Sequence, residues 1–164
     1  VPAYPNKDSL SLEILSSILG TGKSSRLYRT LVNEKGLVVD VKTFNSPLNR
    51  DGFLFFIVAS IKDKEKVDEV EKIIKEEIEK LKSELPSEKE IEKAKNQVEA
   101  SFLFSQDSVF GHALIVGRFE ILGSWKMMDD YRQEIIKVSL QAIQTVTKKY
   151  LNDENLTVGV LLPK

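Results

Sequence analysis

The sequence contains no cysteine and a single histidine, His112, among its 164 residues. Without cysteine the chain cannot form disulfides, use a thiolate nucleophile or bind zinc through sulfur. A catalytic zinc site takes three protein ligands, and usually two or more of them are histidines. We therefore expect no catalytic residue, no metal ligand and no cofactor within this chain.

Long apolar runs and an excess of charge of one sign are also missing. No run approaches the roughly 20 apolar residues of a membrane span, and no signal peptide stands at the start. A net charge of −1 argues against a dedicated nucleic-acid partner. The composition, 41% hydrophobic and 30% charged, is that of a soluble globular protein and fits either the cytoplasm or the periplasm.

The first part of the chain predicts two helices followed by a hairpin. Apolar residues at helical spacing predict a helix over 8–19, which Gly20 ends, and Ser24 or Ser25 is placed to cap a second helix. The runs 37–44 and 53–61 are rich in β-branched and aromatic residues and flank a loop of turn formers, as in an antiparallel hairpin. Because 53–61 is almost unbrokenly apolar, its strand should be buried on both faces at the centre of a sheet.

The second part predicts five helices and a last strand. A stripe of apolar residues with charges between them predicts a helix over 64–83 with a solvated charged face, and SEKE at 87–90 is a capping box that opens the next helix. Helices about Phe110–Phe119, 129–137 and from Ser139 lead to a strand over 156–162. The spacing of four phenylalanines indicates packing in the core: Phe102, Phe104, Phe110 and Phe119.

This order of elements predicts an α+β fold, with an antiparallel or mixed sheet covered on one face by several helices and residues 1–164 forming a single domain. A three-stranded sheet is small for so central a strand. We therefore expect a further strand, either from chain preceding Val1 in a longer protein or from a partner.

Three local patterns have both a chemical and a structural interpretation. GTGKSSRLY (20–28) contains the Gly-Lys-Ser of a nucleotide-binding loop, but Ser17 replaces its first glycine and a helix replaces the strand that should precede it. A joint between two helices is favoured, which leaves nucleotide binding as the weakest hypothesis. His112 could serve in acid–base chemistry, although a partly buried packing role is favoured. Asp129 and Asp130 diverge on a helix and fit its first turn better than a metal site.

Two segments carry a resemblance that covers essentially the whole chain. The run LEILSSILGTGKSSRLYRTLVNEKGLVVDV (12–41) resembles the C-terminal half of pitrilysin/insulinase zinc metallopeptidases, a family that includes the mitochondrial processing peptidase. The closing run VSLQAIQTVTKKYLNDENLTVGVLLP (138–163) is similar to the last helix and strand of those halves.

The resemblance implies one lobe of the LuxS/mitochondrial-processing-peptidase-like metallohydrolase fold, here the C-terminal half of a longer two-lobed protein. In that family two such halves enclose a chamber that holds an unfolded peptide, and the N-terminal half carries the zinc motif H-x-x-E-H. This sequence has no such motif. Its implied function is the non-catalytic wall opposite a zinc lobe, with zinc in the N-terminal lobe or in a homologous partner subunit, possibly as a dimer; the alternative is a domain of a non-proteolytic scaffold homologue.

One departure from the family concerns the peptide-facing positions. Many of these halves carry an Arg and, seven residues later, a Tyr that reach the scissile peptide. The matching positions here are Val32 and Val39, whose side chains donate no hydrogen bond. The resemblance therefore implies either that a partner subunit supplies the donors or that the whole protein is inactive.

Overall fold

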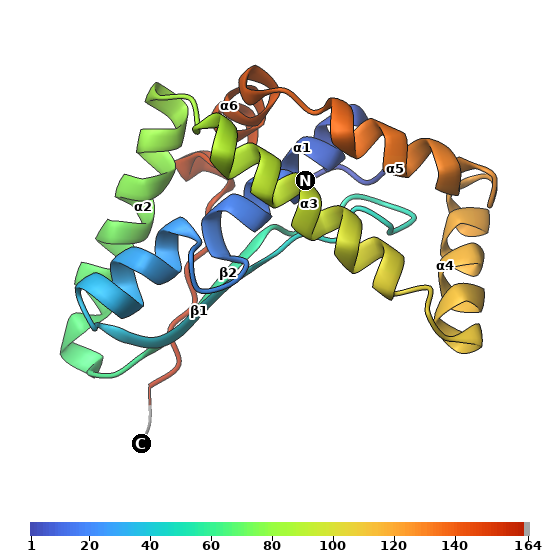
Figure 1. Cartoon of the computed structure of the whole chain (residues 1–164). Helices are drawn as coiled ribbons and strands as arrows, with labels where there is room; N and C mark the ends of the chain where they lie inside the picture. Colours follow the sequence, from blue (N-terminus) through green and yellow to red (C-terminus); the bar gives the residue numbers. More distant parts are fainter. Residues whose placement is uncertain (163–164) are drawn as a thin grey trace.

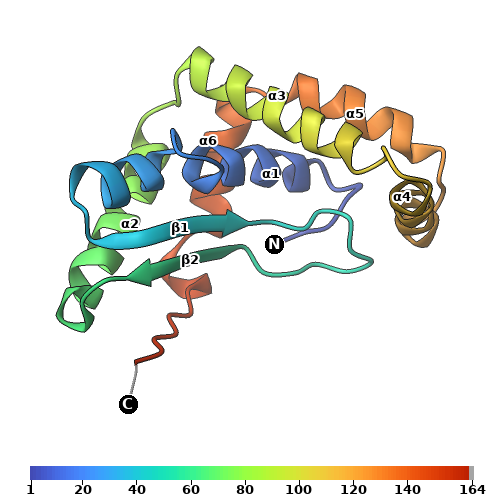
Figure 2. The ribbon, with the colours of Figure 1, turned by 60° about the horizontal axis from the view of Figure 1, so that its bottom comes forward.

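The computed structural model describes residues 1–162 and confirms an α+β architecture, with helices gathered on one face of an antiparallel hairpin (Figures 1 and 2). The elements in chain order are α1 (Lys7–Gly20), η1 (Tyr28–Glu34), β1 (Val38–Phe44), β2 (Phe56–Ile61), η2 (Lys64–Lys66), α2 (Val67–Ser83), α3 (Glu88–Phe104), α4 (Val109–Leu122), α5 (Met127–Lys137), α6 (Leu140–Tyr150) and η3 (Asp153–Asn155). Here η2 and η3 are 3₁₀ turns and η1 is π-helical.

Helix α1 is the centre of the fold. It packs against β1 on one side and against α3, α5 and α6 on others (Figure 2), so every residue from Ser9 to Gly20 except Glu13 is buried. Gly20 lets β1 approach closely, because a Cβ there would lie 2.7 Å from the Thr43 backbone nitrogen. Asn6 caps the helix by accepting a hydrogen bond from the Asp8 N–H, so the helix begins one residue earlier than the sequence predicted.

The hairpin has one covered and one open face. Val38, Val41 and Thr43 of β1 are buried against the helices, and their partners on β2 are Ile61, Ala59 and Ile57. The opposite face carries the alternating residues of both strands. We call it the open face; its members are Val39, Asp40, Lys42, Phe44, Phe56, Val58 and Ser60.

Two predictions about the sheet are wrong. β2 is not central and not buried on both faces: it begins at Phe56 rather than Phe53, Val58 is 52% exposed, and among residues 1–162 it pairs only with β1. Residues 156–162 form no strand, since a strand needs a hydrogen-bonding neighbour and this exposed, extended segment has none within the described chain. Both segments have the apolar pattern of strands, but the strands that would pair with them are not among residues 1–162.

A second cluster of the core is aromatic. Phe119 of α4 meets Tyr4, Phe102 and Tyr131 edge-on, with ring centroids 5.5 to 6.1 Å apart. The predicted burial of Phe104 and Phe110 is wrong, because these rings are 72% and 78% exposed. Helix α4 lies at the end of the molecule and packs mainly on α5 (Figure 1), so only one of its sides is covered.

Candidate functional site

The two residues that the sequence singled out lie on either side of one turn. Val32 is in η1 and packs partly buried against the core, whereas Val39 is in β1 and is 63% exposed. Gly36 makes the turn between them with a φ of +64°, a conformation that favours glycine. The Leu37 N–H donates to the Leu31 carbonyl (2.9 Å) and fixes η1 against the start of β1.

The open face presents an apolar surface without net charge. Phe44 is 51% exposed and lies opposite Phe56, and Val58 is half exposed beside them. Asp40 and Lys42 are the charged members, and they form an ion pair of 2.8 Å with each other. Such a face can contact apolar side chains of an extended ligand, but it offers no free ionised group for chemistry.

The GTGKSSRLY segment is a joint between helices. α1 continues to Gly20, so a helix and not a strand precedes the Gly-Lys-Ser. Ser25 takes the predicted cap position directly before the helical Arg26, and its carbonyl accepts a hydrogen bond from the Arg29 N–H (2.9 Å). Its hydroxyl donates to the Gly22 carbonyl (2.7 Å), which closes the turn. Gly22 has a φ of +82°, which this tight turn requires.

This loop is fastened to α3. The Arg26 guanidinium donates to both carboxylate oxygens of Glu90 (2.7 and 3.1 Å), and Ser24 accepts a hydrogen bond from Lys93. Burial alone would raise the pKa of Glu90, but hydrogen bonds from Arg26 and Ser87 bring that pKa down to about 2. Ser87 and Glu90 form the predicted capping box of α3. The motif's residues thus serve to join α1, η1 and α3.

A partly buried carboxyl group was missed in the sequence. Glu13 of α1 lies beside Tyr131, and the Asn45 side-chain amide donates to its Oε2 (3.1 Å). Burial raises the pKa of Glu13 to about 7, although the hydrogen bond from Asn45 opposes that rise. The Asn45 Oδ1 has no hydrogen-bond partner in the described part of the chain. The signal was a lone acid within the apolar run LSLEILSSIL.

Replacement of Glu13 by glutamine should change how stability depends on pH. The folded protein holds the Glu13 proton more tightly than the unfolded chain does, because the pKa of a glutamate in an unfolded chain is about 4.3. The stability from Glu13 is therefore fully present below about pH 4 and is lost as pH rises through about 7. In urea unfolding, Glu13→Gln should be more stable than wild type at pH 8 by on the order of 2 kcal/mol and similar at pH 4. Exposed Glu92→Gln is the matched control; an equal effect of Glu13→Gln at both pH values would contradict the assignment.

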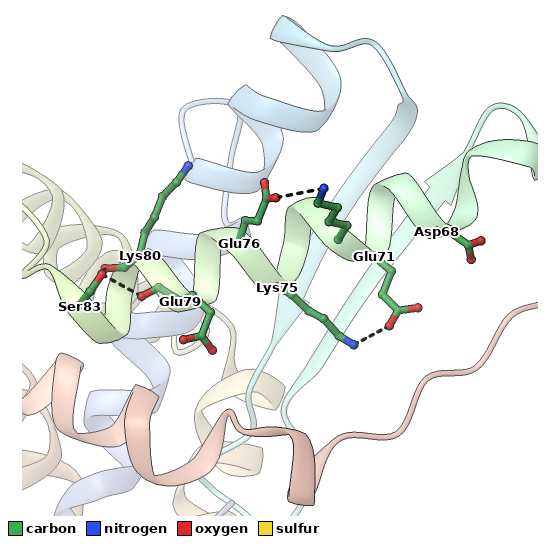
Figure 3. Close-up of a pocket in the computed structure, with 8 residues that line it drawn as sticks. Asp68, Glu71, Lys75, Glu76, Glu79, Lys80 and Ser83 are labelled. Atoms are coloured by element: carbon green, nitrogen blue, oxygen red, sulfur yellow. Dashed lines mark hydrogen bonds and ion pairs between the residues drawn. The ribbon is translucent and has the colours of Figure 1, made fainter.

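A surface depression lies along α2 and is a solvated charged face. It is lined by charged residues of both signs between Asp68 and Lys80 and by Ser83, and Figure 3 shows the charged side chains pairing along the helix rather than converging on one point. Lys75 contacts Glu71 at 2.8 Å, and Lys80 pairs with Glu77 at 2.6 Å. These pairs satisfy one another, and the face offers no site for a ligand.

The described residues include no group that is suited to bind a metal ion. His112 is exposed on α4, so the prediction of a partly buried packing histidine is wrong. Within residues 1–162 no three His, Cys, Asp or Glu side chains come together as a metal site would require. Asp129 and Asp130 occupy the first turn of α5, as predicted. None of the helices among these residues is both long and apolar enough to cross a bilayer.

Comparison with known proteins decides the family. Residues 1–98 match the family model of the peptidase M16 inactive domain. The chain belongs to that family. The zinc protease PqqE of Helicobacter pylori is 28% identical over 163 residues, which are 99% of this chain and 36% of that protein. An uncharacterized zinc protease of Bacillus subtilis, YmxG, is 25% identical over 144 residues, 87% of this chain and 35% of that one.

Two solved structures share the fold of this M16 domain. A protease from Helicobacter pylori superposes with a TM-score of 0.85 at 28% identity, covering 94% of this chain and 37% of that one. A chain of complex III from Candida albicans has the same fold, with a TM-score of 0.77 at 18% identity over 90% of this chain and 37% of that one. This M16 domain therefore spans about a third of the length of the curated relatives it matches.

Proposed function

We propose that this M16 domain is the non-catalytic half of a zinc-dependent peptidase and forms the wall of a peptide-binding chamber opposite a zinc-bearing lobe. The observation that carries the proposal is the match of residues 1–98 to the inactive domain of peptidase M16. It is supported by relatives named zinc proteases that are about three times as long as this chain. The remaining chain of such a protein has room for the lobe that holds the metal.

Zinc does not fit the residues of this chain. One histidine and no cysteine leave only carboxylates as further ligands, and the described residues bring no three candidates together. In the proposal, the metal lies in the N-terminal lobe or in a homologous subunit of a dimer, where zinc when bound activates water. The part played by this domain is to bind and orient the peptide.

The open face is the surface proposed to contact the peptide. Phe44, Phe56 and Val58 expose apolar area that the helices do not cover, and the ion pair of Asp40 with Lys42 leaves the face without net charge. Unfolded peptides expose the apolar side chains that folded substrates bury, so a neutral apolar wall selects for them. Backbone groups of an extended peptide would remain available to the opposite lobe.

Variants of the open face test this role in the whole protein. The pair Phe44→Ser and Phe56→Ser should raise the KM for an unfolded peptide about fivefold, because about 1 kcal/mol of apolar contact is lost. The zinc content and kcat should change little, since neither ring is near a metal ligand in the proposal. Phe110→Ser is the matched control, as Phe110 is exposed on α4 rather than on the sheet. An unchanged KM in the pair, or an equal rise in the control, would refute the assignment of the wall.

The missing donors give a second prediction. Val32 and Val39 stand where the family places an Arg and a Tyr, and we propose that this half leaves those two positions without hydrogen-bond donors. Val32→Arg with Val39→Tyr in the whole protein should raise kcat/KM about tenfold, which corresponds to about 1.4 kcal/mol of transition-state stabilisation. Val32→Leu with Val39→Phe adds bulk without a donor and should give no gain. If both pairs leave turnover unchanged, the two positions are not empty donor sites.

The alternative is a non-proteolytic scaffold. Zinc analysis and peptide hydrolysis of the whole protein separate the two functions. Stoichiometric zinc and turnover that a chelator abolishes support the peptidase, with the 164-residue domain alone inactive. A whole protein without an H-x-x-E-H motif, zinc or turnover supports the scaffold.

A further inference from the structure

Helix α4 carries an exposed apolar line along its outer side. Phe110, Leu114, Gly117 and Ile121 follow one another at spacings of four, three and four residues, which places them along one side of the helix. We call these four residues the α4 stripe. Its three large side chains are 78%, 47% and 66% exposed, whereas Phe119 on the opposite side is fully buried. Figure 1 shows α4 at the edge of the molecule, so the stripe is accessible to a partner.

The glycine in the stripe has no explanation within the described chain. A glycine inside a helix costs about 1 kcal/mol relative to alanine. Gly111 of the same helix is needed, because a Cβ there would clash with the Ser105 carbonyl oxygen. At Gly117, in contrast, a Cβ would meet no atom of residues 1–162 within 4 Å. Gly117 therefore leaves a gap in an exposed apolar line, into which a side chain of another helix can pack.

The α4 stripe is complementary to itself when two copies of α4 run antiparallel. A contact with twofold symmetry is isologous, so Leu114 over Gly117 of a second copy also places Gly117 under that copy's Leu114. Phe110 then lies opposite Ile121 at both ends. In a parallel pair, Phe110 would meet Phe110 and Gly117 would meet Gly117, which would leave a void between the helices. The match of large to small residues therefore favours the antiparallel pair.

The charges beside the stripe are compatible with this pairing. Arg118 and Glu120 border the stripe on its two sides. In the antiparallel pair, Arg118 lies nearest to Gly111 of the second copy and Glu120 nearest to its Ala113. No like charges are brought together, so electrostatic repulsion does not oppose the contact.

The apolar area is that of a dimer interface. Phe104 and Trp125 lie beyond the two ends of α4 and are exposed, as is Phe110, and the exposed parts of these three rings amount to roughly 400 Å². With the aliphatic residues of α4, among them Val109 at 91% exposure, the apolar surface approaches the roughly 800 Å² that each partner of a stable complex buries. Monomeric proteins rarely expose a patch of this size.

We propose that two copies of this protein pair through the α4 stripe, with the helices antiparallel and Leu114 of each copy packed over Gly117 of the other. The stripe lies on α4, whereas the surface proposed to contact a peptide is the open face of the hairpin, so either proposal can fail alone. In samples far more dilute than the dissociation constant each copy is monomeric, and unfolding of α4 variants there reports on the monomer.

Sedimentation velocity of the whole protein over a range of concentrations tests the pairing. Wild type should form a dimer as the concentration rises. Gly117→Leu adds apolar area but fills the gap, so it should weaken the dimer at least tenfold, whereas a merely sticky surface would dimerise more strongly. Gly159→Leu is the matched control, because a Cβ at that exposed glycine also meets nothing within 4 Å, and it should leave the dimer unchanged. Leu114→Ala combined with Gly117→Leu exchanges large for small and should restore most of the affinity.

Cross-linking of single cysteines tests the direction of the helices. This chain has no cysteine of its own, so an introduced one is specific within it. A short bismaleimide should join a Phe110→Cys copy to an Ile121→Cys copy, and two Phe110→Cys copies much less. Coupling of Phe110→Cys only to itself contradicts the antiparallel pair. A dimer that Gly117→Leu leaves unchanged overturns the proposal, and so does a protein that is monomeric at every concentration.

Discussion

Replacing Phe119 by alanine is expected to lower the free energy of unfolding by about 4 kcal/mol. The ring is fully buried where α4 meets the core, and it packs edge-on against Tyr4, Phe102 and Tyr131. Truncation removes the transfer free energy of the ring and leaves a cavity between three rigid rings that cannot readily collapse. The free energy of unfolding of a domain of this size is only about 5–15 kcal/mol, so this one substitution removes a large fraction of the stability.

Urea unfolding of the domain, followed by circular dichroism, measures this loss. Phe110→Ala is the matched control: it removes the same atoms from the same helix, but Phe110 is 78% exposed and should change stability by less than about 0.5 kcal/mol. Similar losses in both variants would show that α4 is not anchored through Phe119. If Phe119→Ala does not fold, Phe119→Leu should still lose about 1 kcal/mol or more.

Local signals in the sequence predicted most helices of the fold. The apolar stripe of α2 and the capping box at Ser87 depend on neighbours within a few residues, and the structure has both. The stop predicted at Gly20 is one residue early, because Gly20 is the last residue of α1 and Thr21 is its cap. The errors lie where a residue's surroundings come from distant chain. Phe110 has a core-like spacing, yet α4 packs on one side only, and β2 has an inner-strand sequence but pairs with β1 alone among residues 1–162.

The candidate site likewise has some features that the sequence predicted and others that depend on distant parts of the chain. Resemblance to the peptidase family located Val32 and Val39, and the structure adds that Val39 is exposed on the sheet whereas Val32 is partly packed; their roles remain predictions. Glu13 could not be assigned from its own helix, because its raised pKa depends on burial against α5 and the end of β1. The open face likewise depends on which side of the hairpin the helices cover, which periodicity alone does not give.

Gly20→Ala is expected to destabilise the domain by about 3 kcal/mol, although alanine is the better helix former. A Cβ at position 20 would lie 2.6 to 2.7 Å from Thr43, against both its side chain and its backbone nitrogen. The Thr43 hydroxyl is held by the Ser16 carbonyl (2.6 Å), and its backbone is part of β1, so the clash must separate α1 from the sheet. Overpacking of this kind costs more than the roughly 1 kcal/mol that alanine gains over glycine in a helix.

The opposite sign is expected for the same substitution in α4. At Gly117 a Cβ meets nothing within 4 Å, so Gly117→Ala should raise the free energy of unfolding by about 0.5–1 kcal/mol through helix propensity alone. Urea midpoints of the two variants compare the effects directly. A Gly20→Ala variant as stable as wild type would mean that α1 and β1 are not in the close contact described here. Because that contact also orients the hairpin, the same variant should raise the KM of the whole protein for an unfolded peptide if the open face binds it.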